Sequence, residues 1–396
     1  MSVRKREWKT RKGEEKEAWI VDYTDQNGDR HIQTFSRKKE ADEYHATVKV
    51  DVRQGVHTPQ SKGITVAEAA EDWIAFVKLE GRERSTVAQY RQHVDHHIKK
   101  RIGGEKLAKL TTPRINSFRD ELLAHMSRAM AKKVLTSLKS LLRDAKRRGK
   151  VAQNVALDVS ISADKRAKKK LKVGVDIPTP DEIKSIIHAA TGKRRPILLT
   201  AIFTGLRSSE LRGLQWQDVD LKKGELHVRQ RADRYNVIGN PKSESGDRTI
   251  PLGPLVLNTL KEWKLACPKG KGGLVFPNGK GNLENHGNIV KRILWPVQVA
   301  AGVTVPVEGA KGKPVHDKDG KPVVQAKYTG THALRHFYAS WCINRKKDGG
   351  LELPMKVIQE RLGHSSIVMT SDTYGHLFPR GDDGSEIAEA ERLLLA

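Results

Sequence analysis

Arginine, histidine and tyrosine side chains gather in four short stretches of the C-terminal half of the chain. In one stretch, His332, Arg335 and His336 are spaced at i, i+3 and i+4, which places all three on one face of a helix. Tyr374 follows ten residues after His364. The stretches are Thr204-Gly205-Leu206-Arg207-Ser208-Ser209-Glu210-Leu211, then Asn240-Pro241-Lys242-Ser243, then Thr331-His332-Ala333-Leu334-Arg335-His336, and finally Leu362-Gly363-His364-Ser365-Ser366, which runs on to Asp372-Thr373-Tyr374-Gly375-His376.

These residue types suit phosphoryl transfer at a phosphodiester. The transition state of that reaction spreads negative charge over the non-bridging oxygens, and a preorganised group of cations stabilises it. Two arginines such as Arg207 and Arg335 can each grip oxygens with two hydrogen bonds. A tyrosine hydroxyl is a competent nucleophile once its proton is removed, and a lysine or histidine can protonate the leaving oxygen. No metal is needed where the protein supplies the charge.

The same residues leave a second interpretation open. His332 and His336 are spaced as a helical metal-binding pair, and His364 is a candidate third ligand. A metal-dependent nuclease is therefore an alternative, although Arg335 and the nearby Arg361 would repel a cation.

The elements that must position these residues belong to a predicted mixed α+β unit spanning 176–396. A capping box over residues 179–182 starts a helix, and a more apolar helix follows over 196–204. Strands and turns are predicted over 224–252. Residues 303–327 are rich in Gly, Pro and Val and are predicted to form a loop or hairpin insertion. The remaining segments are predicted to be helical.

Two smaller units are predicted before it. Residues 1–58 combine strands over 18–23 and 31–35, a turn over 26–29, and a helix that Ser36 caps. Such a β-ribbon is small enough to enter a DNA groove. Residues 64–161 are predicted to be all-helical. There, Thr65 and Glu68 form a capping box, and Thr112 caps a third helix whose first residue is Pro113.

The charge indicates a polyanionic partner. The chain has 73 Lys plus Arg against 47 Asp plus Glu, giving a net charge of +26, and its pI is near 9.9. A basic surplus favours contact with phosphates. Six of the eight residues from Lys165 to Lys172 are basic, so 162–175 is predicted to be an interdomain linker along a DNA backbone. With aromatic residues at 5%, duplex DNA fits better than stacked single strands.

Composition excludes several other classes. The two cysteines, Cys267 and Cys342, are too few for a disulfide framework or a thiolate zinc site. The mean hydropathy is -0.59, and no apolar run approaches the length that crosses a bilayer. The charged N-terminus has no apolar stretch behind it and so does not read as a secretory signal. A cytoplasmic protein without a membrane partner is expected.

Taken together and in order, the motifs resemble those of the tyrosine recombinase (phage integrase) family. They are Thr-Gly-x-Arg-x-x-Glu-Leu, His-x-x-Arg-His, Leu-Gly-His and Tyr-Gly-His, in a basic chain. The resemblance implies a multidomain, mainly α fold with small β-sheets. It implies an arm-type DNA-binding domain of sheet plus helix at 1–58, a helical core-binding domain at 64–161, the linker at 162–175 and a mixed α+β catalytic domain at 176–396.

The resemblance also implies roles for individual residues. Arg207 and Arg335 would hold the scissile phosphate. Tyr374 would attack it, leaving a 3′-phosphotyrosyl bond and a free 5′-hydroxyl. Lys242, on a β-hairpin, would be the general acid for the departing 5′ oxygen.

Three further residues would assist. His332 would help proton movement at the tyrosine or hold the phosphate, and His364 would donate a hydrogen bond to a non-bridging oxygen. Glu210, three residues after Arg207, resembles the family's acidic residue that braces the site.

The implied reaction is DNA integration or excision by a site-specific recombinase. The ester conserves the bond energy, so no nucleotide or other cofactor is implied. The expected partners are double-stranded DNA, three further copies of the chain in a homotetramer, and accessory proteins that bend DNA or set direction. Two alternatives stay open: a type IB topoisomerase, which forms the same bond and relaxes supercoils, and a DNA-binding protein with an inactive site.

Overall fold

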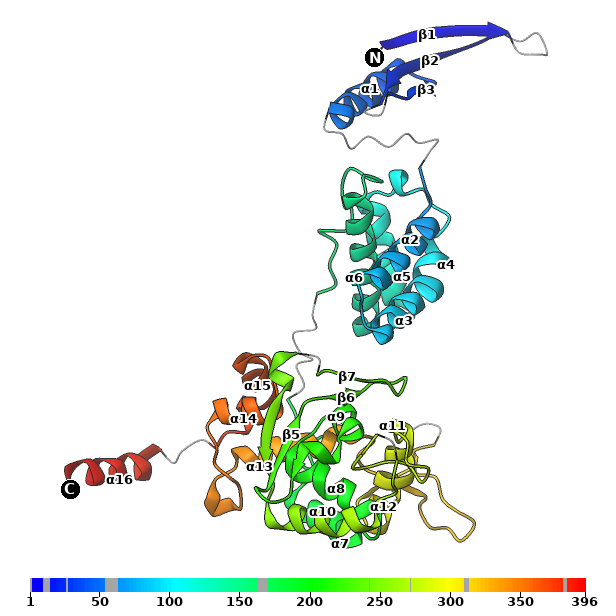
Figure 1. Cartoon of the computed structure of the whole chain (residues 1–396). Helices are drawn as coiled ribbons and strands as arrows, with labels where there is room; N and C mark the ends of the chain where they lie inside the picture. Colours follow the sequence, from blue (N-terminus) through cyan, green and yellow to red (C-terminus); the bar gives the residue numbers. More distant parts are fainter. Residues whose placement is uncertain are drawn as a thin grey trace. The chain divides into compact units, whose positions relative to one another are not determined.

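A computed structural model of the chain describes residues 2–9, 15–25, 28–53, 63–162, 170–241, 243–270, 272–309, 313–379 and 383–396. The chain divides into two compact units, Met1–Ala167 and Lys168–Ala396 (Figure 1). The division falls inside the predicted linker 162–175. In the described part of the chain, no helix has both the length and the apolar character needed to span a membrane.

The N-terminal segment folds as a three-stranded antiparallel sheet with a helix packed on it (Figure 1). The strands are β1 (Ser2–Lys9), β2 (Glu15–Thr24) and β3 (Arg30–Phe35), in the order β1-β2-β3, followed by α1 (Lys38–Arg53). Val21, Tyr23, Ala41 and Val48 form its small core. The sequence predicted β2, β3 and α1.

Strand β1 is an edge strand that the sequence pattern did not predict. Seven of its eight residues are exposed and five are charged, so it carries no apolar alternation to detect. Backbone pairing to β2 holds it, together with ion pairs such as Lys5 to Glu17 at 2.6 Å and Lys9 to Glu15 at 3.2 Å. Charged residues on an edge strand also discourage pairing with other chains.

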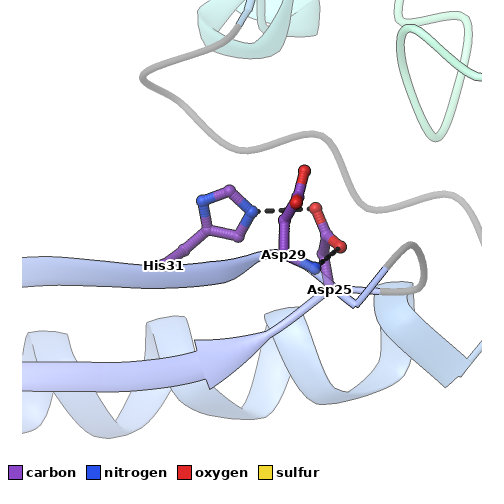
Figure 2. A group of neighbouring side chains, drawn as sticks. All are labelled: Asp25, Asp29 and His31. Carbon is purple, nitrogen blue, oxygen red and sulfur yellow. Dashed lines mark hydrogen bonds and ion pairs between the residues drawn. The ribbon is translucent and has the colours of Figure 1, made fainter.

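The turn between β2 and β3 is organised by Asp25 (Figure 2). Its carboxylate accepts a hydrogen bond from the Asp29 backbone N–H at 2.9 Å and contacts His31 Nε2 at 2.8 Å. Gly28 adopts a φ of +88°, which a residue without Cβ tolerates. The predicted turn over 26–29 lies partly outside the described residues, since only Gly28 and Asp29 belong to them.

The helical segment consists of α2 (Val66–Leu79), α3 (Arg84–His93), a π-helix (Val94–Ile98), α4 (Lys99–Ile102), α5 (Thr112–His125) and α6 (Arg128–Arg147). The predicted capping box is present: Glu68 N–H donates to Thr65 Oγ1 at 3.2 Å, and Thr65 N–H donates to Glu68 Oε2 at 2.7 Å. The apolar faces meet in one core that buries Trp73, Phe118 and Leu138.

One predicted cap in this segment is wrong by one residue. The N-cap of α5 is Thr111, whose side chain accepts a hydrogen bond from the Arg114 N–H. Thr112 is instead the first helical residue, and its hydroxyl donates to the Val155 carbonyl at 3.2 Å. Two consecutive threonines before a proline fit both registers, so the local pattern could not separate them.

The second unit begins with α7 (Pro180–Ala189), α8 (Arg194–Thr204) and α9 (Ser208–Gly213). The predicted capping box of Thr179 and Glu182 starts α7. Helix α8 is buried almost all round, as its apolar sequence predicted. A three-stranded antiparallel sheet follows, in the order β4 (Val219–Asp220), β5 (Glu225–Val228) and β8 (Arg248–Pro251). The short strands β6 (Arg231–Ala232) and β7 (Ile238–Gly239) pair separately.

The rest of this unit is mostly helical, as predicted. It contains α10 (Pro254–Ala266), α11 (His286–Asn288), α12 (Trp295–Ala300), α13 (His332–Ile343), α14 (Met355–Leu362), α15 (Ile367–Tyr374) and α16 (Asp383–Leu395). In the described part of the predicted insertion 303–327, β9 (Thr304–Pro306) pairs antiparallel with β10 (Val324–Ala326). The observed architecture confirms the predicted class, mainly α with small sheets, and one core joins α8, β5, α10 and α13.

Candidate active site

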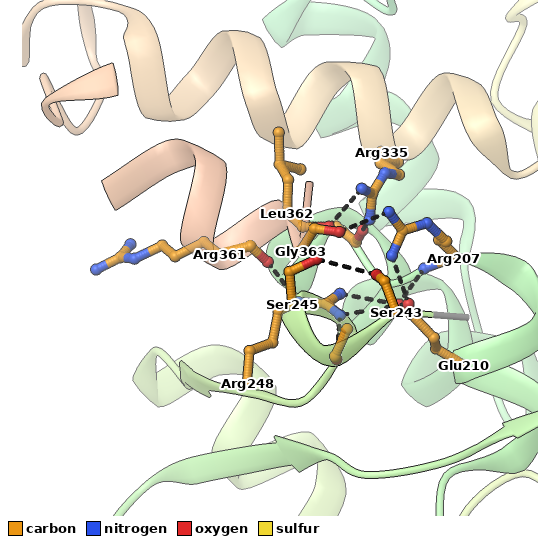
Figure 3. A network of polar contacts seen from close by, with 11 residues as sticks. Arg207, Glu210, Ser243, Ser245, Arg248, Arg335, Arg361, Leu362 and Gly363 are labelled. Atoms are coloured by element: carbon orange, nitrogen blue, oxygen red, sulfur yellow. Dashed lines mark hydrogen bonds and ion pairs between the residues drawn. The ribbon is translucent and has the colours of Figure 1, made fainter. Parts of the chain in front are cut away.

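Four helix ends of the second unit bring the predicted residues together. Arg207 precedes α9, Arg335 lies in the first turns of α13, His364 follows α14, and Tyr374 ends α15. Figure 3 shows Arg207 and Arg248 bonded to Glu210, while the backbone carbonyls of residues 361–363 face the guanidinium groups of Arg207, Arg248 and Arg335. Of the six predicted catalytic residues, Lys242 lies outside the described residues; the others are described below.

Arg335 is a buried cation held by neutral groups. Its side chain is 1% exposed, and its guanidinium donates to the Gly205 carbonyl at 2.6 Å and to the Leu362 carbonyl at 2.5 Å. Burial, followed by the positive charge of Arg207, lowers its pKa to about 9, so it is still charged at pH 7. The carbonyls that accept these two hydrogen bonds lie at helix C-termini and carry only partial negative charge, so they compensate the charge of Arg335 in part.

Arg207 is the N-cap residue of α9 and makes three hydrogen bonds. Its backbone N–H donates to Glu210 Oε2 at 2.9 Å, and its guanidinium donates to Glu210 Oε1 at 2.7 Å and to the Gly363 carbonyl at 2.8 Å. Its side chain remains 35% exposed. The guanidinium is therefore fixed at one edge and open to solvent at another.

Two glycines allow this arrangement. Gly205 and Gly363 end α8 and α14 with φ values of +61° and +64°, the left-handed conformation that aims their carbonyls at the arginines. A Cβ on Gly205 would lie 2.4 Å from the ring of Tyr338, and one on Gly363 would lie 2.8 Å from Arg248 Nη1. A side chain at Gly205 would displace Tyr338, and one at Gly363 would displace Arg248.

Arg248, on β8, is a part of the site that the sequence analysis missed. Its guanidinium donates to Glu210 Oε2 at 2.8 Å, to the Gly246 carbonyl at 3.0 Å and to the Arg361 carbonyl at 2.8 Å. Its side chain is 5% exposed. The available signal was an arginine on the inward side of a short alternating strand, a position that normally takes an apolar residue.

Glu210 is the buried carboxylate that Arg207 and Arg248 share. Burial opposes its ionisation, but the hydrogen bond and charge of Arg248, with the charge of Arg207, outweigh burial and hold the pKa of this carboxyl below its usual range. Against three guanidinium groups, this network of described residues contains one carboxylate. The predicted bracing position of Glu210 therefore fits its contacts.

Tyr374 lies beside this cluster with its side chain 1% exposed. Its hydroxyl forms a hydrogen bond with His336 Nδ1 at 2.8 Å, and its ring stacks on that of His364 with centroids 6.3 Å apart. Burial raises the pKa of Tyr374 to about 12, while the charges of Arg335 and Arg207 oppose the increase. The phenol is therefore protonated at pH 7, and the nearby arginines favour its ionised form.

The histidines occupy distinct positions. His364 Nδ1 contacts the buried Thr370 hydroxyl at 2.9 Å, and burial together with the charge of Arg335 lowers its pKa to about 4. His332 is exposed, and partial desolvation with the charges of Arg335 and Arg207 lowers its pKa. Its ring lies 4.5 Å from that of His336, so α13 presents two imidazoles side by side.

These histidines do not form the metal site that their spacing left open. Among the described residues, three ligand atoms of His, Cys, Asp or Glu converge within 4.8 Å at Asp25, Asp29 and His31, in the N-terminal sheet segment. The Asp25 carboxylate of that group is already engaged by His31 and by the turn backbone. The site around Arg335 offers hydrogen-bond donors and positive charge, which suit an anion rather than a cation.

The arrangement can stabilise a phosphodiester undergoing displacement. A phosphate near Arg207 would meet preorganised donors whose charge is not fully cancelled, and such donors stabilise developing negative charge. The tyrosine hydroxyl beside them is a nucleophile whose ionisation the same charges promote.

Comparisons with known proteins agree with this chemistry. The model of the "Phage integrase family" matches residues 178–380. The XerC-like tyrosine recombinase of Caldanaerobacter subterraneus subsp. tengcongensis is 26% identical, over 90% of this chain and 90% of that protein. The ICEBs1 integrase of Bacillus subtilis is 23% identical, over 87% of each.

Solved structures show the same fold. The Tn1549 transposon integrase, solved with transposon right end DNA, superposes with a TM-score of 0.59 at 21% identity, over 84% of this chain and 100% of that one. Lambda integrase, solved as a dimer on a core site, superposes with a TM-score of 0.55 at 18% identity, over 96% of this chain and 95% of that one. The observed architecture is therefore that of an integrase.

Proposed function

The chain belongs to the phage integrase family and is a tyrosine-type site-specific DNA recombinase, and from that premise we propose that it cuts and rejoins duplex DNA through a 3′-phosphotyrosyl bond at Tyr374. The observation that carries the proposal is the burial of the Tyr374 hydroxyl beside two arginines, Arg335 and Arg207, that shift its ionisation. A tyrosine with a purely structural role would not need two arginine charges beside its hydroxyl.

The remaining roles follow from position. Arg207 and Arg335 hold the scissile phosphate, because their donors and charges face the same region. Glu210 keeps Arg207 in place through two hydrogen bonds. Lys242, on the segment before β8, is proposed as the general acid for the 5′ oxygen, on the motif alone.

His364 and His332 complete the proposed set. His364 is neutral at pH 7, so its tautomer decides whether Nε2 carries a hydrogen or accepts one. In the tautomer with the hydrogen on Nε2, His364 can donate a hydrogen bond to a non-bridging oxygen of the phosphate. His332 is exposed next to the charges of Arg335 and Arg207, which suits a contact to the phosphate.

The first 161 residues are proposed to recognise DNA. We assign 1–58 to arm-type sites, 64–161 to the core site and the basic run within 162–175 to the DNA backbone. The net charge of +26 supports phosphate contact over a large area. Duplex DNA as substrate makes the cytoplasm the expected location.

The proposed active assembly is a homotetramer on two duplexes. Lambda integrase, which shares the fold, has been solved as a tetramer bound to a Holliday junction. Residues 387–395 of helix α16 are exposed, and the helix ends in Leu393, Leu394 and Leu395, so this end is available to pack on another copy. The ICEBs1 and Tn1549 relatives support a mobile element as the substrate. Accessory proteins that bend DNA and set direction are proposed on the family resemblance alone. Topoisomerase and nuclease activities are not favoured, because these relatives are recombinases and integrases.

The test uses purified protein and DNA flanking its own gene, carrying a nick near the crossover so that the cut fragment diffuses away. We expect a protein–DNA adduct that survives detergent, disappears on proteolysis and forms in the presence of a chelator. Tyr374→Phe is the matched control and should bind the DNA without forming the adduct. Cleavage that requires a divalent metal and survives this substitution would overturn the proposal.

A further inference from the structure

The hydroxyl of Tyr374 has a partner to which the motif pattern gave no role. His336 Nδ1 lies 2.8 Å from that hydroxyl, and the two rings meet edge to face with centroids 5.7 Å apart. Among the residues that the structure describes, His336 is the side chain hydrogen-bonded to this oxygen. The two side chains come from α13 and α15, so the contact depends on the tertiary fold.

The other histidine of the same helix has a different environment. His332 is exposed, while His336 is half-buried one turn further along α13. The neighbours that act on His332 are Arg335 and Arg207, the two proposed phosphate-binding groups. Arg335 acts on both imidazoles, but Arg207 acts on His332 and the Tyr374 hydroxyl bonds His336, so α13 places His332 near the proposed phosphate-binding groups and His336 against the tyrosine.

We propose that His336, rather than His332, is the catalytic residue that accepts the proton of Tyr374 during strand cleavage. This inference rests on the proposed function. As the Tyr374 oxygen forms its bond to phosphorus, the bond from phosphorus to the 5′ oxygen breaks. The phenolic proton moves to His336 Nδ1, and the 5′ oxygen takes a proton from the general acid, assigned above to Lys242. Rejoining runs in reverse: His336 returns its proton to the departing tyrosine oxygen.

The surroundings of His336 suit this role. To accept a proton at Nδ1, the imidazole must be neutral with its hydrogen on Nε2. Burial, with the charges of His332 and Arg335, lowers its pKa to about 4, while Asp176 acts in the opposite direction. The ring is therefore neutral at pH 7. A bound phosphate adds negative charge that favours the protonated imidazole at the moment of transfer.

The substitution His336→Asn isolates proton transfer from hydrogen bonding. The asparagine amide lies close to the position of Nδ1, so it keeps a polar partner for Tyr374 but cannot take a proton. His336→Gln, whose amide lies near Nε2, is the second variant, and His332→Asn is the matched control one turn away. DNA-binding affinity and circular dichroism check that each variant folds.

We expect single-turnover adduct formation on nicked DNA to fall by about 10²- to 10⁴-fold in both His336 variants, the usual contribution of a general base. The rate of the wild type should decrease with falling pH, and this acid limb should be absent from His336→Asn and retained by His332→Asn. If His336→Asn keeps the wild-type rate and acid limb, the inference is overturned. If the wild type forms no adduct, or Tyr374→Phe still forms one, the proposed function itself fails.

A DNA substrate with sulfur at the 5′ bridging position distinguishes the loss of the general base from the loss of the general acid. Replacing the 5′ bridging oxygen with sulfur creates a leaving group that departs as a thiolate and needs no proton, because thiols ionise near pH 8.5. We expect this substrate to restore cleavage by Lys242→Ala and to leave His336→Asn slow. Restoration of His336→Asn would mean that His336 acts on the leaving group, which contradicts the inference.

Discussion

Arg114 of the helical segment 64–161 and Arg335 of the site around Tyr374 are held in opposite ways. In the helical segment, Arg114 binds the carboxylates of Glu105 at 2.8 Å and Glu121 at 3.1 Å, with its side chain 28% exposed. Around Tyr374, Arg335 is 1% exposed and binds two backbone carbonyls. The first guanidinium is paired with negative charge, and the second is not.

The comparison shows how a fold can prepare an anion site without a bound anion. Neutral carbonyls satisfy the donors of Arg335, which a buried cation requires, yet they leave its charge free to act on a ligand. In the network of described residues, three arginines (Arg207, Arg248 and Arg335) surround one carboxylate, Glu210, which leaves an excess of two positive charges. Surface pairs such as that of Arg114 have no such excess.

The largest expected effect comes from Arg335→Lys. An ammonium group cannot reach both the Gly205 and Leu362 carbonyls with the planar geometry of a guanidinium. We expect adduct formation on nicked DNA to fall by about 10³-fold, the upper range for the loss of one preorganised donor. DNA-binding affinity should change little, because the proposed DNA-recognition units within residues 1–161 remain intact. A variant within about tenfold of the wild-type rate would show that the carbonyl-held charge is not needed.

The next largest effect is expected from neutralising the shared carboxylate of Glu210. Glu210→Gln leaves Arg207 and Arg248 without their counter-ion, and the loss of one partner of a buried pair costs about 3 kcal/mol in the free energy of unfolding. Denaturant unfolding of the full chain measures this cost, and Arg248→Met should show a similar loss. The double variant should lose less than the sum of the two. Strict additivity would mean that the two side chains are not coupled in the folded protein.

An effect of pH is expected from His364. Its pKa is about 4 in the folded protein against an ordinary value near 6.5, so between these pH values the unfolded chain binds more protons. Stability should therefore be constant above pH 6.5 and decrease as the pH falls towards 4, by at most about 3 kcal/mol from this residue. Melting temperatures from pH 7.5 to 4.5 measure it. His364→Asn should make this acid limb shallower without abolishing it, because the pKa of His336 is also lowered to about 4; an unchanged slope would exclude a contribution from His364.

The smallest effect is expected in the helical segment. Arg114→Gln removes exposed ion pairs to Glu105 and Glu121, which typically contribute less than about 1 kcal/mol and are screened by salt. Unfolding at low and at high salt should show a small loss that salt abolishes. A cost as large as that of Glu210→Gln would remove the contrast between the two regions.

The sequence predicted the elements and motifs of the site better than the hydrogen bonds and ion pairs that connect its residues. Arg207, Arg335, His364 and Tyr374 were found because each lies in a short local pattern, and the structure brings them together. Arg248 was missed because its contacts join it to Glu210 and to the Arg361 carbonyl, far away in the chain. The same limit applies to His336, since the i, i+4 spacing predicts a shared helix face but not which imidazole meets the tyrosine.

Strand β1 and the cap of α5 show two other limits. The exposed, charged residues of β1 carry no period of two, so only pairing with β2 reveals the strand. At Thr111 and Thr112, both residues are competent caps, and the choice depends on the contact of Thr112 with the Val155 carbonyl. In each case a tertiary contact, rather than local preference, decides the outcome.

The most direct test of the account is to identify the residue and the DNA end joined in the covalent adduct. Adduct trapped on nicked DNA would be digested with protease and nuclease, and the nucleotide-bearing peptide sequenced by mass spectrometry, with end-labelled strands reporting polarity. We predict a nucleotide 3′-phosphate esterified to Tyr374 and a free 5′-hydroxyl on the released strand. A nucleotide on any other residue, or attachment through a 5′-phosphate, would contradict the account.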